Sequence, residues 1–169
     1  MMNLQKIVMG AVIGTFLVGS LPTVIFAAED DKPLPPVPKV YADKHMPKGG
    51  WTDPAALAAG KKIFEEKTRE IEIKGKMEKV QCAACHGKDG KPKKRGVKNM
   101  SSTKTFNRYS DSYWFWRISE GVPKTMMKPW KEILTEEQRW QVMAYEHAFS
   151  HGKKAAPHEH PEIQVNVEK

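Results

Sequence analysis

The sequence has 169 residues, 28 of them basic and 20 acidic, which gives a net charge of +8 at pH 7. This length accommodates one modest domain with tails, so two independent cores are not expected. A basic surface suits nucleic acid, an anionic membrane or an acidic protein, and an export signal at the start of the chain disfavours nucleic acid and favours an acidic protein.

The first 27 residues have the pattern of a secretory signal peptide. One charged residue, Lys6, precedes an uncharged stretch that ends in Phe26-Ala27-Ala28, just before the acidic Glu29. This order of a basic start, an apolar run and small residues predicts cleavage after Ala27 and export, for example to a periplasm. The apolar run is also long enough to span a bilayer, so a retained membrane anchor is the alternative.

Four segments follow from composition along the chain. Residues 1–27 form the predicted signal peptide, and residues 28–50 are rich in proline and lysine, which predicts a solvated linker outside the core. Residues 51–152 carry the apolar periodicity of one folded domain, and residues 153–169 are predicted to be a mobile tail.

The folded domain is predicted to begin with a helix over residues 53–66. Asp53 is an N-cap residue, and Pro54 stands at the first helical position, where proline is well tolerated. Gly60 and Phe64 share one face of this helix. Because Gly60 has no side chain, that face allows another helix to approach closely.

Residues 67–81 form an insertion of ambiguous secondary structure. Ile71 and Ile73 alternate with charged residues, as in a strand. Gly75 could either turn a hairpin or interrupt a helix, and the role of this segment is not indicated by its sequence.

The segment Cys82-Ala83-Ala84-Cys85-His86 has the C-x-x-C-H spacing of a haem attachment signal. Two thiols at this spacing can add to the two vinyl groups of one porphyrin, and the histidine that follows supplies the proximal iron ligand. A thioredoxin-like dithiol, half of a zinc site and a chance disulfide are the alternatives, but each lacks its sequence context. We therefore predict one covalently bound haem c.

A loop over residues 88–98, here called the basic loop, concentrates positive charge directly after the haem motif. Such a cluster can steer an acidic redox protein or oxidoreductase toward the haem. A solvated loop without a partner is the alternative. The cationic residues of the basic loop are Lys88, Lys91, Lys93, Lys94, Arg95 and Lys98.

Residues 109–120 have the pattern of a short aromatic helix capped by Ser110 or Asp111. Aromatic side chains at successive positions cannot all face one core, so some are expected to meet the haem or a partner. Trp116, Tyr109 or Arg108 could donate a hydrogen bond to a haem propionate.

The next segment, residues 121–130, is a loop bracketed by prolines that could cross the haem and present a thioether. We call it the methionine loop, because Met126 and Met127 are both candidates for the distal iron ligand.

The last predicted helix is the clearest. Thr135 and Gln138 have the spacing of a capping box before an apolar run that reaches Phe149, and Gly152 is expected to end the helix. Four histidines near the end of the chain have no fixed metal-ligand geometry, and no separate metal site is predicted at His147, His151, His158 or His160.

The order of these features resembles class I cytochrome c over about residues 53–150. The features are the helix with Gly60 and Phe64, the segment Cys-Ala-Ala-Cys-His-Gly, the G-V-P-x-T-x-M loop and a terminal helix containing Tyr145. The resemblance implies an all-α fold around one haem, in which the first and last helices cross where Gly60 and Phe64 meet Tyr145.

The same resemblance implies that Met127 is the distal iron ligand, with Met126 as the fallback. Two features depart from the family pattern. Lys128 stands between Met127 and Pro129, where the family usually has proline directly after the ligand, and the run before the haem motif is longer than usual.

A haem iron ligated by His86 and Met127 has no open coordination position, so it exchanges electrons without binding a substrate. The sequence therefore predicts an electron carrier that is not itself an enzyme, either a free shuttle or the haem subunit of a larger oxidoreductase. A haem enzyme or gas-binding sensor with a labile distal position is the alternative function.

Overall fold

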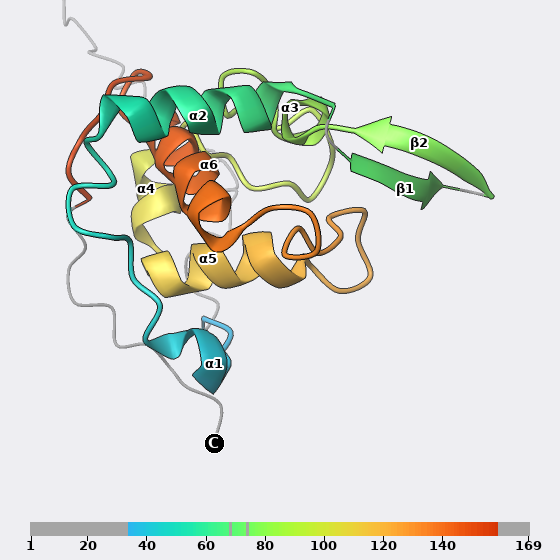
Figure 1. The fold of residues 1–169 in the computed structure, drawn as a ribbon, viewed down its shortest axis with the longest axis horizontal. Helices are drawn as coiled ribbons and strands as arrows, with labels where there is room; N and C mark the ends of the chain where they lie inside the picture. The colour runs from blue at the N-terminus through green and yellow to red at the C-terminus, as the bar shows by residue number, and fades with distance from the viewer. Residues whose placement is uncertain (1–33, 68, 74, 159–169) are drawn as a thin grey trace, which may run out of the picture. The chain divides into compact units, whose positions relative to one another are not determined.

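The computed structural model describes residues 34–67, 69–73 and 75–158, and Figure 1 shows their fold. The predicted signal peptide and the last 11 residues of the chain, 159–169, lie outside the described residues. Within the described part of the chain, every helix is too short or too polar to cross a membrane.

Two helices, α2 (Pro54–Glu65) and α6 (Glu136–Phe149), begin at the predicted caps. The side chain of Asp53 accepts a hydrogen bond of 2.9 Å from the backbone nitrogen of Ala55. At the start of α6, Thr135 and Gln138 form both hydrogen bonds of the capping box, as predicted. Helix α6 ends at Phe149, before Gly152, which follows in a turn.

Helices α2 and α6 cross at Gly60, and Figure 1 shows the crossing. A Cβ atom on Gly60 would lie 2.0 Å from the carbonyl oxygen of Gln141 and 3.0 Å from the Cβ of Tyr145. The rings of Phe64 and Tyr145 meet edge to face with their centroids 5.6 Å apart. The predicted crossing of the first and last domain helices is therefore confirmed.

Helix α5 (Asp111–Glu120) is the predicted aromatic helix, and its cap is Ser110, whose hydroxyl accepts a hydrogen bond of 3.1 Å from the backbone nitrogen of Tyr113. It packs on α6 through the rings of Phe115 and Trp140, which stack at 3.8 Å between centroids and 14° between planes. This contact joins α5 to α6.

Residues 34–50 pack on α5, so the interpretation of this segment as a solvated linker outside the core is wrong for the residues described. It contains a helical turn, α1 (Lys39–Ala42). Tyr41 is buried and its hydroxyl donates a hydrogen bond to the carboxylate of Glu120, while the hydroxyl of Ser112 donates to the carbonyl oxygen of Ala42 at 3.1 Å. The prediction relied on the proline and lysine content of the segment and overlooked the apolar Val37 and Tyr41, which pack in the hydrophobic core.

The ambiguous insertion is a β-hairpin. Strands β1 (Arg69–Ile73) and β2 (Lys76–Val80) pair antiparallel, with Ile73 opposite Lys76. Gly75 lies in the turn with a φ of +78°, a backbone conformation that glycine adopts without strain. Figure 1 shows the hairpin projecting outward beyond α3, and apart from this hairpin the helices and strands of the described residues are all α-helical.

The remaining described helices are short. Helix α3 (Cys82–His86) is the haem motif itself, and α4 (Thr103–Asn107) lies between the basic loop and α5. Phe106 of α4 is fully buried, and the indole nitrogen of Trp114 donates a hydrogen bond of 3.0 Å to its carbonyl oxygen.

The crossing predicts that Gly60→Ala destabilises the protein. In an exposed helix this substitution would stabilise by about 1 kcal/mol, because alanine has the higher helix propensity. Here the added methyl group meets the backbone of α6, so urea unfolding should show a loss of about 1–3 kcal/mol instead. The control is Ala58→Leu at an exposed position of α2, which should change the free energy of unfolding little. A stabilised Gly60→Ala variant would contradict the close crossing.

Candidate functional site

Helix α3 is a single turn, and it ends directly after His86. The backbone nitrogen of Gly87 donates a hydrogen bond of 3.0 Å to the carbonyl oxygen of Ala83. Gly87 has a φ of +74°, and a Cβ atom there would lie 2.2 Å from the carbonyl oxygen of Lys91. The basic loop then folds back on α3, since the backbone nitrogen of Lys93 bonds the carbonyl oxygen of Cys85 at 2.9 Å.

This geometry places the three chemical groups of the motif on the wall of one cavity of about 510 Å³. We call it the motif cavity. Apolar side chains from α5 and from the end of the methionine loop form much of its lining, and Trp114, Ile118 and Trp130 are buried there.

The two cysteines are free thiols. Burial raises the pKa of Cys82 well above its ordinary value, and the nearby carboxyl of Glu146 adds to this effect. A redox-active dithiol needs the opposite shift, because the thiolate is its nucleophile. The environment of Cys82 therefore argues against the thioredoxin-like alternative.

His86 is half-buried, and its Nδ1 atom has no hydrogen-bond partner among the described residues. Burial lowers the pKa of His86 to about 4, because the charged imidazolium is poorly solvated there. The imidazole is consequently neutral at pH 7 and offers a lone pair, which is the form that ligates iron.

The methionine loop is closed by its own backbone. The nitrogen of Val122 donates a hydrogen bond of 2.8 Å to the carbonyl oxygen of Met127. The hydroxyl of Thr125 donates to the carbonyl oxygen of Val122 at 2.8 Å and accepts from the nitrogen of Met127 at 3.1 Å. Gly121 begins this turn with φ +72° and ψ −163°, a conformation restricted essentially to glycine.

Both candidate methionines line the motif cavity together with Cys82, Cys85 and His86. Met127 is half-buried and packs against the hydrophobic core, whereas the side chain of Met126 is 56% exposed. The structure thus brings the predicted thiols, imidazole and thioether to one cavity, with Met127 the better anchored of the two methionines.

Several residues that line the motif cavity were not identified as site residues by sequence analysis, and Met100, Arg117 and Glu146 are among them. Arg117 is one helical turn after Tyr113, and its guanidinium lies 5.3 Å from the centroid of that ring, so its face of α5 could have been found from helical spacing. Met100 is buried in an irregular loop, where no periodic pattern marks it.

The residues proposed from sequence to bond a propionate, Trp116, Tyr109 and Arg108, are not among those that line the motif cavity. Arg117 lines it instead, and its Nε atom has no hydrogen-bond partner within the described part of the chain. The guanidinium also lies 3.7 Å from the centroid of the Trp116 ring.

Positive charge surrounds this cavity. The basic loop contributes Lys94, Arg95 and Lys98, and the methionine loop adds Lys124 and Lys128. The other cationic residues of the basic loop are exposed beside them: Lys88, Lys91 and Lys93.

The histidines near the end of the chain pack with aromatic rings. The ring of His158 lies 4.4 Å from that of Trp51 and 4.6 Å from that of His147, between centroids. Among the residues that the structure describes, no three histidine, cysteine or acidic side chains gather in a way that could hold a metal ion. His160 lies outside the described residues.

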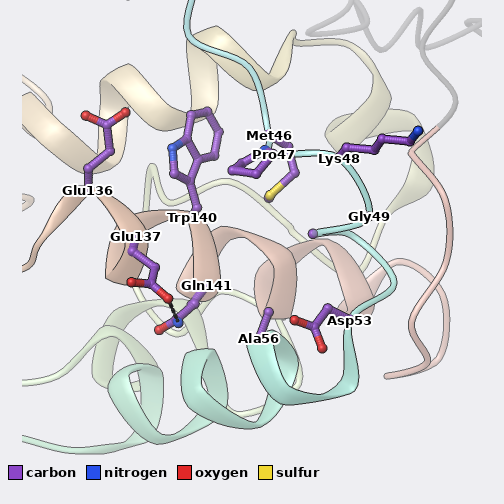
Figure 2. A pocket seen from close by; sticks show the side chains of 11 residues that line it. Met46, Pro47, Lys48, Gly49, Asp53, Ala56, Glu136, Glu137, Trp140 and Gln141 are labelled. Carbon is purple, nitrogen blue, oxygen red and sulfur yellow. Dashed lines mark hydrogen bonds between the residues drawn. The ribbon is translucent and has the colours of Figure 1, made fainter.

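A second cavity, of about 610 Å³, lies between the segment before α2 and the start of α6, and Figure 2 shows it. Met46, Lys48, Asp53, Glu137 and Trp140 are among its lining residues. None of the predicted haem-binding residues lines this second cavity.

Comparison with known proteins finds one matching family model, described as cytochrome c oxidase, cbb3-type, subunit III, over residues 72–145. A solved structure described as KustC0563 c-type cytochrome is 32% identical, covers 40% of this chain and 86% of its own, and has a TM-score of 0.38. Cytochrome CL from the marine methylotrophic bacterium Methylophaga aminisulfidivorans MPT is 18% identical, over 81% of this chain and 89% of its own, with a TM-score of 0.44. No curated protein matches the chain significantly.

The geometry of the methionine loop predicts that Gly121→Ala is more damaging than the same change at Gly96. Both glycines have positive φ, +72° and +81°, so both substitutions carry backbone strain. Only at Gly121 does the added Cβ meet other atoms, 2.2 Å from the carbonyl oxygen of Met127, whereas nothing lies within 4 Å at Gly96. Chemical unfolding should show an additional loss of about 1–3 kcal/mol for Gly121→Ala, from overpacking. Equal losses at the two positions would contradict the described loop.

Proposed function

The chain belongs to the class I c-type cytochromes, and from this premise we propose that it is an exported electron carrier with one covalently bound haem c. In this proposal Cys82 and Cys85 attach the haem, His86 is the proximal iron ligand and Met127 is the distal one. The observation that carries the proposal is that these four side chains line one cavity.

The motif cavity fits a haem in its size and its chemistry. Its volume of about 510 Å³ lies within the range of pockets that hold cofactors. Its wall presents two thiols, a neutral imidazole and three thioether side chains, while much of the remaining lining is apolar. Arg117 and Lys98, which also line it, supply positive charge that suits propionate groups.

Bound haem c supplies an iron that changes by one electron between the ferric and ferrous states. The thiols of Cys82 and Cys85 would each hold the porphyrin through one thioether bond and so prevent loss of the cofactor. His86 would donate its ring lone pair to the iron, and Met127 would be the second protein ligand, which would exclude water and small ligands. The buried Trp114, Ile118 and Trp130 lower the local dielectric, which disfavours the extra positive charge of ferric iron.

c-Type cytochromes of this kind are electron carriers and are typically exported. This supports reading residues 1–27 as a secretory signal that is cleaved after Ala27 in a periplasmic or otherwise exported protein. With His86 and Met127 as its ligands, the iron would exchange electrons without binding a substrate. The carrier acts either as a free shuttle or as the haem subunit of a larger oxidoreductase.

The distal ligand is tested by replacing the two neighbouring methionines separately. Met127→Ala should remove the far-red absorption band of a thioether bound to ferric iron, lower the reduction potential and allow carbon monoxide to bind ferrous haem. Met126→Ala should leave all three properties nearly unchanged, because its side chain is largely exposed.

Met100→Leu is a second control, because Met100 is a further methionine in the motif cavity. If Met126→Ala changed these three properties and Met127→Ala did not, the distal ligand would be Met126. An unmodified protein that lacks the band and binds carbon monoxide quickly would instead support a haem enzyme or gas-binding sensor.

We also propose that the carrier docks an acidic redox protein or oxidoreductase through the basic loop. Lys94, Arg95 and Lys98 line the motif cavity, so this surface lies beside the proposed haem. The charges of Lys88, Lys91 and Lys93 extend it outward on the same loop. Opposite charges on a partner would speed the encounter and orient the haem edge toward the partner's own redox group.

Docking predicts that Lys93→Glu/Lys94→Glu slows electron transfer to or from an acidic partner about tenfold or more at low salt. Stopped-flow kinetics at several ionic strengths measures this effect, which should shrink as salt screens the charges. The matched control is Lys39→Glu/Lys48→Glu, which changes the net charge equally on the segment before α2, where Lys48 lines the second cavity (Figure 2). Equal rates for the two double variants, or rates indifferent to salt, would contradict docking through the basic loop.

A further inference from the structure

A buried carboxyl group in the motif cavity has no part in the function proposed above. Glu146 lies on α6, is 3% exposed and lines the cavity together with Cys82. Its Oε2 atom has no hydrogen-bond partner among the described residues. An unpaired carboxylate is costly in such a place, so the group is expected to carry a proton unless a positive charge appears nearby.

The helical spacing of α6 explains why Glu146 faces this cavity. Gln141 and Tyr145 face α2 at the crossing with Gly60. Glu137 precedes Glu146 by nine residues, which is two and a half helical turns, so the two carboxyl groups point to opposite sides of α6. Figure 2 accordingly shows Glu137 at the second cavity, where its carboxylate accepts a hydrogen bond of 3.2 Å from the side chain of Gln141.

The charged and titratable groups around Glu146 come from every element that surrounds the cavity. None of them makes a hydrogen bond with the Oε2 atom of Glu146 within the described part of the chain. On α6 itself, Arg139 donates a hydrogen bond to the carbonyl oxygen of Leu134, and on α2 Glu65 accepts one from Tyr145. The groups that line the cavity are Cys82 and His86 of α3, Tyr113 and Arg117 of α5, Lys94, Arg95 and Lys98 of the basic loop, and Lys124 and Lys128 of the methionine loop.

The charge of the haem iron changes with its oxidation state, and this change affects the protonation of Glu146. Oxidation adds one positive charge inside the cavity, which favours the carboxylate form of Glu146, and reduction removes that charge, which favours the carboxylic acid. Because Glu146 is buried and much of the cavity lining is apolar, its carboxylate and the iron would interact more strongly than they would in water. Burial raises the pKa of Glu146 to about 8. A change in the charge of the iron can therefore change the protonation of Glu146 near neutral pH.

We propose that Glu146 takes up one proton when the haem iron is reduced and releases it when the iron is oxidised. Reduction then consumes one electron from the redox donor and one proton from water, and it forms an O–H bond on the Glu146 carboxylate. Oxidation breaks this bond and returns the proton to the solvent. The inference rests on the proposed function, because it requires the haem in the motif cavity.

The test is the pH dependence of the reduction potential in the haem-loaded protein between pH 5 and 10. For one electron coupled to one proton, the potential falls by up to 59 mV per pH unit between the pKa values of the oxidised and reduced forms, a tenfold change per unit. Glu146→Gln keeps the size and polarity of the side chain but cannot titrate. Its potential should stay near the acid-side value of the unmodified protein across the interval.

Glu137→Gln is the matched control, because it removes one carboxyl from the same helix at the second cavity. It should retain the full slope of the unmodified protein. A slope that survives in Glu146→Gln would assign the proton to another group, such as a haem propionate, and would overturn the proposal.

A second measurement needs no variant. In weakly buffered solution at a pH within the sloping interval, a pH indicator should report uptake of up to one proton per haem reduced, and infrared difference spectra should show a protonated carboxyl band in the reduced form. A haem-loaded protein with a flat potential and no proton uptake would overturn the role of Glu146 alone. A protein without attached haem would instead overturn the proposed function.

Discussion

The close contact between α2 and α6 at Gly60 is the constraint on which the rest of the structure depends. The backbone of Gln141 occupies the space of a Gly60 side chain, so the two helices meet at a distance that no other residue permits. On one side of this crossing, α2 leads through the hairpin into α3 and the haem motif. On the other, α6 carries Trp140 to α5 and Glu146 to the motif cavity.

The motif cavity combines an apolar interior with a positively charged surround. Trp114 and Trp130 are buried in its wall, while Lys94 and Lys128 line it from two loops. Such an arrangement separates the two demands on an electron carrier. In the proposed function, the interior would stabilise the less charged state of the iron, and the positive surround would attract a partner of opposite charge.

Much of the fold could be predicted because its signals are local or depend on one residue. The caps of α2 and α6 and the crossing at Gly60 were predicted from Asp53, Thr135 and the glycine itself, and the structure confirms them. The packing of residues 34–50 was missed, because a composition rich in proline and lysine outweighed the apolar Val37 and Tyr41. The pairing of these residues with α5 is a tertiary contact with no counterpart in local sequence.

The candidate site divides in the same way. The haem motif carries its chemistry in five consecutive residues, and the methionine loop was found from its order of glycine, proline and methionine. Met100, Arg117 and Glu146 come from three separate elements, and only the folded chain brings them to one cavity. A single glutamate such as Glu146 gives no sequence signal of its own, since glutamate is common on exposed helix faces.

The central claim is that Cys82, Cys85 and His86 hold one haem in the motif cavity, and the mass of the purified, denatured protein tests it most directly. The account predicts the mass of the polypeptide from residue 28 onward plus one haem, with haem staining retained on a denaturing gel and lost in the Cys82→Ala/Cys85→Ala variant. If acid-acetone extraction moved the haem into the solvent and left a polypeptide with no added haem mass, the result would contradict the account.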